Sequence, residues 1–214
     1  MATPFRDGVN AAYWPRTLGG NFVEIVDRLA VSGGITTLEE HDLRGLSLSA
    51  AGRAALDVLM EDQARLRAHG LAPSLDCIAD YSRSESDALV PTDVYSFHAD
   101  SATVETDTYL CSYTEAASEG LRNEDARRYV DVPEVRTRLL KEFGGADNAS
   151  FTEYLAEQCF NLHYEALPAT RPYSFGLGNL WRIAVDYPNS LVPPCIHRAP
   201  QTTPGQRPRL LLIS

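Results

Sequence analysis

The chain of 214 residues has no run of basic side chains, and its formal net charge is −10. DNA and RNA bind to Lys and Arg side chains that neutralise phosphates, and an anionic membrane surface repels a negative protein. We therefore expect neither a nucleic acid nor a membrane as partner, and a small molecule as substrate. The sequence leaves the oligomeric state open.

Cysteine is sparse too, with four residues and no C-x-x-C pair. This spacing suits neither a zinc knuckle nor a disulfide framework. The first residues lack the apolar stretch of a signal peptide, and no run of about 18 apolar residues is present to span a bilayer. These absences predict a cytoplasmic protein with reduced thiols at Cys77, Cys111, Cys159 and Cys195.

Neither an internal repeat nor a polar linker divides the chain. Its hydrophobic content of 44% and charged content of 22% are those of an ordinary globular protein. Because all-β barrels of about 200–250 residues often fold as one unit, we expect a single domain covering residues 1–214.

The amino-terminal part, about residues 1–72, has helical patterns. Apolar residues recur at helical spacing after Asn21, a natural N-cap, and again after Ser49, which can cap a helix over about 49–69. Such stripes usually pack in a core. The first stripe consists of Phe22, Ile25, Val26 and Leu29, and the second of Leu56, Leu59, Met60 and Leu66.

From about residue 73 to residue 214 the pattern is that of short strands divided by polar turns. A helical insertion interrupts it at about 133–160, where Pro133 and a Ser150–Glu153 capping box each predict a helix start. We expect a mainly β protein, a sandwich or barrel with flanking helices packed outside. The predicted strands are Leu75–Tyr81, Val94–Asp100, Thr106–Thr114, Leu180–Asp186, Pro194–Ala199 and Arg209–Ser214.

Two residues of one predicted strand form the first candidate site. Side chains two apart in a strand point to the same face, so His98 and Asp100 would direct an imidazole and a carboxylate to one point. A later histidine, His197, lies in another predicted strand, shortly before the last one. Two histidines and one carboxylate form the facial triad that suits iron(II) and leaves coordination positions open.

An arginine pair follows this histidine. Arg207 lies ten residues beyond His197, and Arg209 would share its face of the last strand. A guanidinium group can hold a carboxylate through a bidentate, charge-assisted fork. Pro208 between them cannot donate a ladder hydrogen bond, which predicts a strand start or an edge at this point.

Together these residues resemble the iron(II)- and 2-oxoglutarate-dependent dioxygenases of the double-stranded β-helix superfamily. The pattern of that family is His-x-Asp/Glu, a distant His, and an Arg shortly after it that often begins Arg-x-Ser. The matching positions are His98-Ala-Asp100, His197 and Arg207-Pro-Arg209. The resemblance covers about residues 74–214.

The resemblance implies a double-stranded β-helix core, of the jelly-roll, cupin-like kind, at about 73–214. It implies that His98, Asp100 and His197 bind iron(II), and that Arg207 grips the far carboxylate of the co-substrate 2-oxoglutarate, with O₂ as oxidant. The implied reaction is hydroxylation, desaturation or cyclisation at an unactivated C–H bond, because Asp100 takes the position that a halide would need. An amino acid or a biosynthetic intermediate would be a fitting substrate.

Two features depart from the family pattern. Arg209 stands where the motif usually has a serine, so a second cation would grip the same carboxylate or the substrate. The long segment between Asp100 and His197 leaves room for the helices at about 133–160, which are candidates for a lid over the site.

Other candidates carry less specific signals. Tyr109 and Tyr113 offer hydroxyls that would suit 2-oxoglutarate, although core packing is the commoner role of such residues. Trp181 and Arg182 lie on the predicted strand before His197 and are candidates for substrate contact, with a core tryptophan and a paired arginine as the alternative.

The remaining histidines are His41, His69 and His163, and they have no partners at metal-ligand spacing. Of these, His163 could be mistaken for a metal ligand. Cys195 lies two residues before His197 and is interpreted as a small buried hydrophobic side chain.

Two alternatives remain open. One is a cupin-type metal enzyme that does not use 2-oxoglutarate, such as an isomerase or another dioxygenase, which would have no need of the arginine pair. The other is a metal-free binding module in which His98 and His197 are structural, which an iron titration would reveal.

Overall fold

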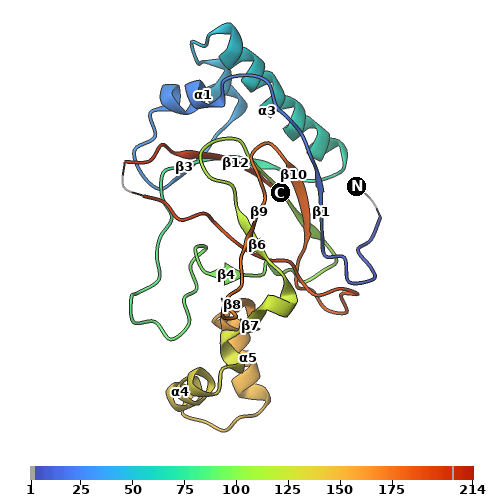
Figure 1. Ribbon diagram of the computed structural model, residues 1–214, viewed down its shortest axis with the longest axis vertical. Helices are drawn as coiled ribbons and strands as arrows, with labels where there is room; N and C mark the ends of the chain where they lie inside the picture. The colour runs from blue at the N-terminus through green and yellow to red at the C-terminus, as the bar shows by residue number, and fades with distance from the viewer. Residues whose placement is uncertain (1–2, 204) are drawn as a thin grey trace.

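A computed structural model describes residues 3–203 and 205–214 and shows two six-stranded antiparallel sheets (Figure 1). The first, called sheet A, has the strand order β1 (Ala11–Trp14), β10 (Leu180–Ala184), β5 (Asp107–Ser112), β12 (Arg209–Ile213), β3 (Ser74–Ile78) and β2 (Ile35–Thr37). The second, sheet B, has the order β7 (Ala126–Arg128), β8 (His163–Ala166), β4 (Phe97–His98), β11 (Ile196–Arg198), β6 (Glu119–Leu121) and β9 (Tyr173–Ser174). The prediction of a mainly β protein with flanking helices is therefore confirmed.

The helices lie at two ends of the molecule (Figure 1). One group, α1 (Phe22–Leu29), α2 (Glu40–Arg44) and α3 (Ala50–Ala68), packs against the outer face of sheet A. The other group, α4 (Pro133–Phe143) and α5 (Ala149–Glu157), lies beyond β7 and β8 with its own apolar cluster. Short 3₁₀ turns complete the chain at Asn123–Asp125, Tyr129–Asp131 and Phe160–Leu162. None of the described helices combines the length and apolar character that crossing a membrane requires.

The predicted caps of α1 and α3 are confirmed. The Asn21 side chain accepts a hydrogen bond from the backbone N–H of Glu24, and Ser49 accepts one from Gly52. The predicted Ser150–Glu153 capping box is wrong. Asn148 caps α5 instead, because its side-chain oxygen already accepts the backbone N–H groups of Ser150 and Phe151.

The amino-terminal part supplies strands as well as helices, which the sequence pattern did not indicate. Strands β1 and β2 form the two edges of sheet A and pair with β10 and β3. Ile35–Thr37 is exposed along its whole length, so no apolar alternation identifies it. Such edge strands depend on distant partners rather than on their own composition.

Side chains of sheet A alternate between two environments. Leu210 and Leu212 of β12 pack in the cluster beneath α1 and α3, whereas Leu211 faces sheet B. On β5, Cys111 lies on the helical side and Leu110 on the side of sheet B. This alternation of period two decides which residues of each strand can reach the space between the sheets.

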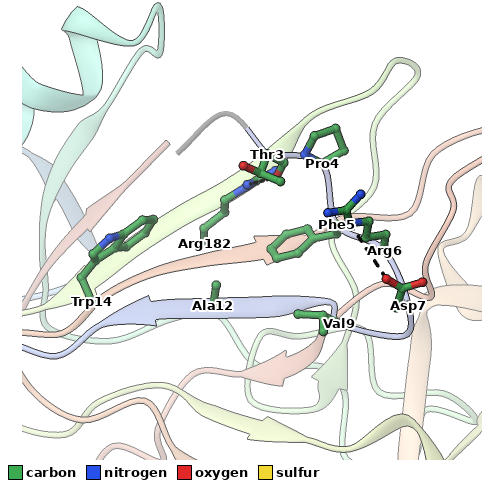
Figure 2. Close-up of a pocket in the computed structure, with 9 residues that line it drawn as sticks. All are labelled: Thr3, Pro4, Phe5, Arg6, Asp7, Val9, Ala12, Trp14 and Arg182. Atoms are coloured by element: carbon green, nitrogen blue, oxygen red, sulfur yellow. Dashed lines mark hydrogen bonds and ion pairs between the residues drawn. The ribbon is translucent and has the colours of Figure 1, made fainter.

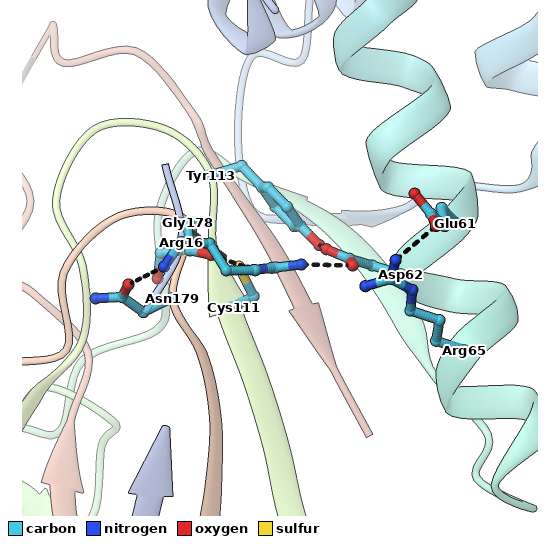
Figure 3. Close-up of polar contacts among 9 residues, drawn as sticks. Arg16, Glu61, Asp62, Arg65, Cys111, Tyr113, Gly178 and Asn179 are labelled. Atoms are coloured by element: carbon cyan, nitrogen blue, oxygen red, sulfur yellow. Dashed lines mark hydrogen bonds and ion pairs between the residues drawn. The ribbon is translucent and has the colours of Figure 1, made fainter. Parts of the chain in front are cut away.

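A buried ion pair joins α3 to sheet A (Figure 3). Asp62 on α3 is only 2% exposed, and its two carboxylate oxygens accept hydrogen bonds from Arg16 Nη1 at 2.6 Å and Tyr113 Oη at 2.7 Å. The Arg16 Nε donates to the carbonyl of Gly178 at 2.8 Å. The carboxylate thus connects the helix to two separate segments of the β structure.

Replacement of Asp62 should destabilise the fold strongly. The change Asp62→Ala leaves the Arg16 guanidinium partly buried without its carboxylate, so we expect a loss of about 3–5 kcal/mol in the free energy of unfolding. Urea denaturation measures it. The neighbouring Glu61→Ala is the matched control, because the Glu61–Arg65 pair is exposed and should contribute below about 1 kcal/mol. Equal losses in both variants would contradict this role of Asp62.

Candidate metal centre

The two predicted histidine ligands lie opposite each other in sheet B. His98 on β4 and His197 on β11 are direct cross-strand partners, and their ring centroids are 4.6 Å apart. Both side chains leave the sheet on its inner face. On the outer face, Phe97 and Ile196 pack together in a small apolar cluster. The pairing register therefore brings two imidazoles from distant parts of the chain into the space between the sheets.

Asp100 completes the group just after the end of β4. Its Oδ1 lies 4.0 Å from His98 Nε2 and 3.8 Å from His197 Nε2. Its Oδ2 accepts a hydrogen bond of 2.7 Å from Thr108 Oγ1 on β5. The backbone is fixed as well, because the Asp100 carbonyl accepts the N–H of Asp186 at 2.7 Å. One carboxylate oxygen is thus anchored while the other faces the histidines.

Backbone carbonyls orient both imidazole rings. His98 Nδ1 lies 2.8 Å from the carbonyl of Ser96, and His197 Nδ1 lies 3.4 Å from that of Cys195. A carbonyl accepts only from an N–H, so the shorter contact assigns the proton of His98 to Nδ1 and leaves its Nε2 lone pair toward Asp100. Burial, followed by the nearby His197, lowers the pKa of His98 to about 4, so its ring is neutral at pH 7.

This donor set fits a divalent metal ion. One ligand atom from each of His98, Asp100 and His197 lies within 4.8 Å of the others. Two imidazoles and one carboxylate, each held by a further hydrogen bond, are the ligands that suit iron(II) and leave coordination positions open. The separations of 3.8 and 4.0 Å exceed the roughly 3 Å between adjacent ligands at right angles on bonds of about 2.1 Å, so the side chains would draw inward on binding.

Arg209 lies in the same cavity as the three residues. It is the first residue of β12 and is 4% exposed. Its Nη2 donates to Ser112 Oγ and Ser118 Oγ, both at 2.7 Å, and its Nη1 donates to Tyr81 Oη at 3.2 Å. Its Nε has no hydrogen-bond partner in the described part of the chain.

The charge of Arg209 is therefore buried among neutral hydroxyl groups. No carboxylate of the described residues forms an ion pair with it, and burial lowers the pKa of its guanidinium. A buried cation without a counterion costs free energy, which an incoming anion recovers. The group is thus prepared for a negatively charged ligand.

Arg207 lies elsewhere, which corrects the prediction that both arginines share a face of the last strand. Arg207 precedes β12 and forms an exposed ion pair with Asp27 of α1, at 3.0 Å between Nε and Oδ1. The strand begins only after Pro208, so its alternation does not extend back to Arg207. Of the two predicted carboxylate ligands, the structure brings only Arg209 to the candidate site.

The cavity between the sheets has a volume of about 180 Å³. Its polar lining includes His98, His197, Asp100 and Arg209 together with Asp76, whose Oδ1 accepts hydrogen bonds from Thr37 and Ser74, and its apolar wall comes mainly from sheet A. Larger hollows of about 410 to 500 Å³ near the surface contain none of the three triad residues. The apolar wall on sheet A is formed by Ile35, Ile78, Leu110, Leu211 and Ile213.

Tyr109 and Tyr113, predicted as candidates for 2-oxoglutarate binding, lie on the opposite face of sheet A. Both pack in the cluster beneath the helices, and the Tyr113 hydroxyl donates to Asp62. Their neighbour Leu110 lines the cavity instead. Because β5 carries buried apolar side chains on both faces, its sequence does not show which face meets sheet B. The structure therefore does not bring Tyr109 to the candidate site.

Of the two residues predicted to contact substrate, Arg182 points away from the cavity. It lines a surface hollow with Phe5 and Trp14 (Figure 2). It also forms an ion pair of 2.5 Å with Asp107 of β5. Trp181 faces the space between the sheets and stacks on Phe175 with ring centroids 4.2 Å apart. Since Phe175 in turn lies 6.4 Å from the ring of His197, Trp181 supports the wall behind the site and does not line it.

The other histidines stay outside the triad. His41 is exposed beside Asp42, and His69 ends α3. His163 is buried 5.7 Å from the ring of His98, but its Nδ1 is engaged with Ser96 Oγ at 2.8 Å. Cys195 is buried as expected, and burial raises the pKa of its thiol to about 12.

Several residues of the site were missed by the sequence analysis. Thr108 anchors Asp100, and Tyr81, Ser112 and Ser118 surround Arg209. Hydroxyl residues are common in strands, so only knowledge of which strands are neighbours would have selected them. The predicted lid is not seen, because none of the described residues between 133 and 160 lines the cavity.

Comparison with models of known protein families, with curated proteins and with solved structures found no match. The site is therefore interpreted from its own geometry and from the sequence pattern.

Removal of one triad residue should abolish tight metal binding. For His98→Ala and His197→Ala we expect loss of tight cobalt(II) binding, a spectroscopic substitute for iron(II), because only two protein ligands remain. Absorption titration measures the affinity. His163→Gln is the matched control, since it replaces the nearest histidine that does not belong to the triad. Loss of binding in His163→Gln but not in His98→Ala would contradict the assignment.

The stability of the metal-free protein should fall in mildly acidic solution. Burial lowers the pKa of His163 from 6.5 to about 4, so between these pH values the unfolded chain binds a proton that the folded protein does not. The free energy of unfolding therefore decreases as the pH falls from about 6.5 to about 4. His163→Gln should make this decrease shallower in urea denaturation. An unchanged slope would show that His163 is not the group responsible.

Proposed function

We propose that this protein is an iron(II)- and 2-oxoglutarate-dependent oxygenase. The observation that carries the proposal is Arg209, a buried guanidinium without a carboxylate partner in the same cavity as His98, Asp100 and His197. A metal triad alone would serve many enzymes. An anion site beside it suits a co-substrate that chelates the metal at one end and carries a carboxylate at the other.

The strand arrangement supports a double-stranded β-helix core. Along the chain, β3, β4, β5 and β6 alternate between sheets A and B, and β10, β11 and β12 alternate again. Together with β9 these are eight antiparallel strands in two facing sheets, the arrangement of a jelly roll. In this interpretation both histidines belong to one sheet and the arginine to the other.

Each residue of the cavity would have a separate task. The three triad residues would hold iron(II), which supplies oxidation of a C–H bond by O₂ coupled to conversion of 2-oxoglutarate to succinate and CO₂. Arg209 would pair with the far carboxylate. The Tyr81 hydroxyl, which accepts from Arg209, keeps its own hydrogen to donate to the same carboxylate.

The remaining features of the cavity would control the reaction. Its apolar wall on sheet A excludes water, which strengthens the pairing of Arg209 with an anion. Thr108 holds Asp100 in one orientation, so the carboxylate remains a ligand throughout. With this position occupied by Asp100, hydroxylation, desaturation or cyclisation is favoured over halogenation.

Anaerobic addition of iron(II) and 2-oxoglutarate tests the function. We expect a visible charge-transfer band from the chelate. Arg209→Met should weaken the affinity for 2-oxoglutarate by about ten- to a hundredfold, because a charge-assisted hydrogen-bonded pair is lost while the side-chain volume is roughly kept. Titration of the band with 2-oxoglutarate measures this change.

Arg207→Ala is the control, since Arg207 lies in a surface ion pair with Asp27. Its affinity for 2-oxoglutarate should equal that of the unmodified protein. Metal binding by Arg209→Met, followed with cobalt(II), shows that this variant is folded. The proposal fails if the unmodified protein gives no band, or if Arg207→Ala rather than Arg209→Met loses the affinity.

A further inference from the structure

A second hollow adjoins the cavity of the candidate metal centre. It has a volume of about 430 Å³ and is formed by residues 81–84 and 92–94 together with Ile35. We call it the outer hollow. Three of its residues, Ile35, Tyr81 and Val94, also line the inner cavity, so the two spaces share a wall. A molecule in the outer hollow therefore lies next to the cavity that contains the triad.

The outer hollow contains one arginine, Arg83. Its guanidinium lies over the ring of Tyr95, 4.0 Å from the centroid. Both terminal nitrogens approach Gln201 Oε1 at 3.4 Å, which is long for a hydrogen bond. No carboxylate of the described residues forms an ion pair with it. Exposed arginines elsewhere are of both kinds: Arg127 and Arg136 have carboxylate partners, whereas Arg138 forms no ion pair with a described residue.

Tyr95 provides a fixed support for this guanidinium. It is 4% exposed, and its hydroxyl contacts Thr202 Oγ1 at 2.9 Å and accepts the backbone N–H of Tyr81 at 3.3 Å. Its ring also packs edge-to-face against Tyr81, whose hydroxyl contacts Arg209. Stacking on a rigid ring limits the conformations of Arg83, so less freedom is lost when it binds a ligand.

The only acid of the outer hollow is already engaged. The Asp93 carboxylate accepts backbone N–H groups from Ser84, Tyr95 and Ser96 at 2.8 to 3.1 Å. In turn, the Ser84 hydroxyl accepts the N–H groups of Thr92 and Asp93. These bonds hold the two sides of the hollow together and direct the Asp93 carboxylate to the backbone rather than to Arg83.

We propose that Arg83 binds a carboxylate of the substrate, so that the substrate is a small carboxylic acid whose reacting carbon extends toward the triad. The proposal rests on the proposed function. A carboxylate matches the planar fork of one arginine. A phosphate dianion matches less well, because the hollow has a single cation and the Asp93 charge nearby.

Matched pairs of acids and amides test this assignment on the metal-free protein. The probes are phenylacetate, indole-3-acetate and N-acetyl-leucine, each compared with its primary amide at low salt by ligand-observed NMR. Acid and amide have the same body, so a difference in affinity reports the charge. We expect at least one pair to favour the acid by about tenfold or more, as a charge-assisted hydrogen-bonded pair provides.

Substitutions of Arg83 then show whether this side chain causes the preference for the acid over its amide. Arg83→Gln should remove it, whereas Arg83→Lys should keep part of it, since the charge remains but the fork is lost. Arg138→Gln is the control, because it removes an equal charge from the exposed side of α4. If Arg209 held the acid instead, the Arg83→Gln variant would still bind the acid more tightly than its amide.

Two results overturn the inference: no pair favours the acid, or the preference survives Arg83→Gln. The charge-transfer band from iron(II) and 2-oxoglutarate distinguishes failure of the substrate inference from failure of the proposed function. A protein that forms the band without an acid preference at Arg83 contradicts the substrate class alone. If the acid preference depends on Arg83 but no band forms, the carboxylate site at Arg83 is supported and the proposed oxygenase function is contradicted.

Discussion

The pairing of β4 with β11 is the constraint on which the candidate site depends. These strands lie in the middle of sheet B, and their register places His98 directly opposite His197. A shift by one residue would turn one imidazole to the outer face of the sheet. Because β4 has only two residues, backbone bonds outside the ladder help to hold the register, including Ala99 N–H to Leu162 and Ala199 N–H to Val94.

Sheet A buries two guanidinium groups in opposite ways. On its helical side, Arg16 meets a full partner in Asp62, and the pair joins a helix to the sheet. On its inner side, Arg209 meets only the hydroxyls of Tyr81, Ser112 and Ser118. The first arrangement is complete without a ligand and serves stability. The second has no carboxylate within ion-pair distance among the described residues, and for this reason it indicates binding.

The sequence predicted the elements better than their arrangement. Helical periodicity located the helices near residues 22, 50 and 133 because burial of a helical stripe depends on local spacing. The residues of the triad were also identified, since a His-x-Asp pair two apart and a late histidine are local patterns. Strands β1 and β2 were missed because exposed edge strands carry no such pattern.

The faces of the strands could not be predicted in the same way. Both sides of β5 and β12 carry buried apolar residues, one set beneath the helices and one toward sheet B. Alternation shows that Tyr109 and Leu110 point in opposite directions, but not which of them meets the site. The choice between Arg207 and Arg209 depended on where β12 begins, which its pairing with β3 and β5 determines.

The position of β12 also has a consequence for the timing of folding. It lies between β5 and β3, so sheet A is divided in two until Arg209–Ile213 is in place. During synthesis, β3 and β5 therefore cannot pair with β12 until about a hundred further residues have been added, at about 5–20 residues per second. Over that interval the backbone N–H and C=O groups along these edges of β3 and β5 have no partner strand, and such unpaired edges favour association with other chains.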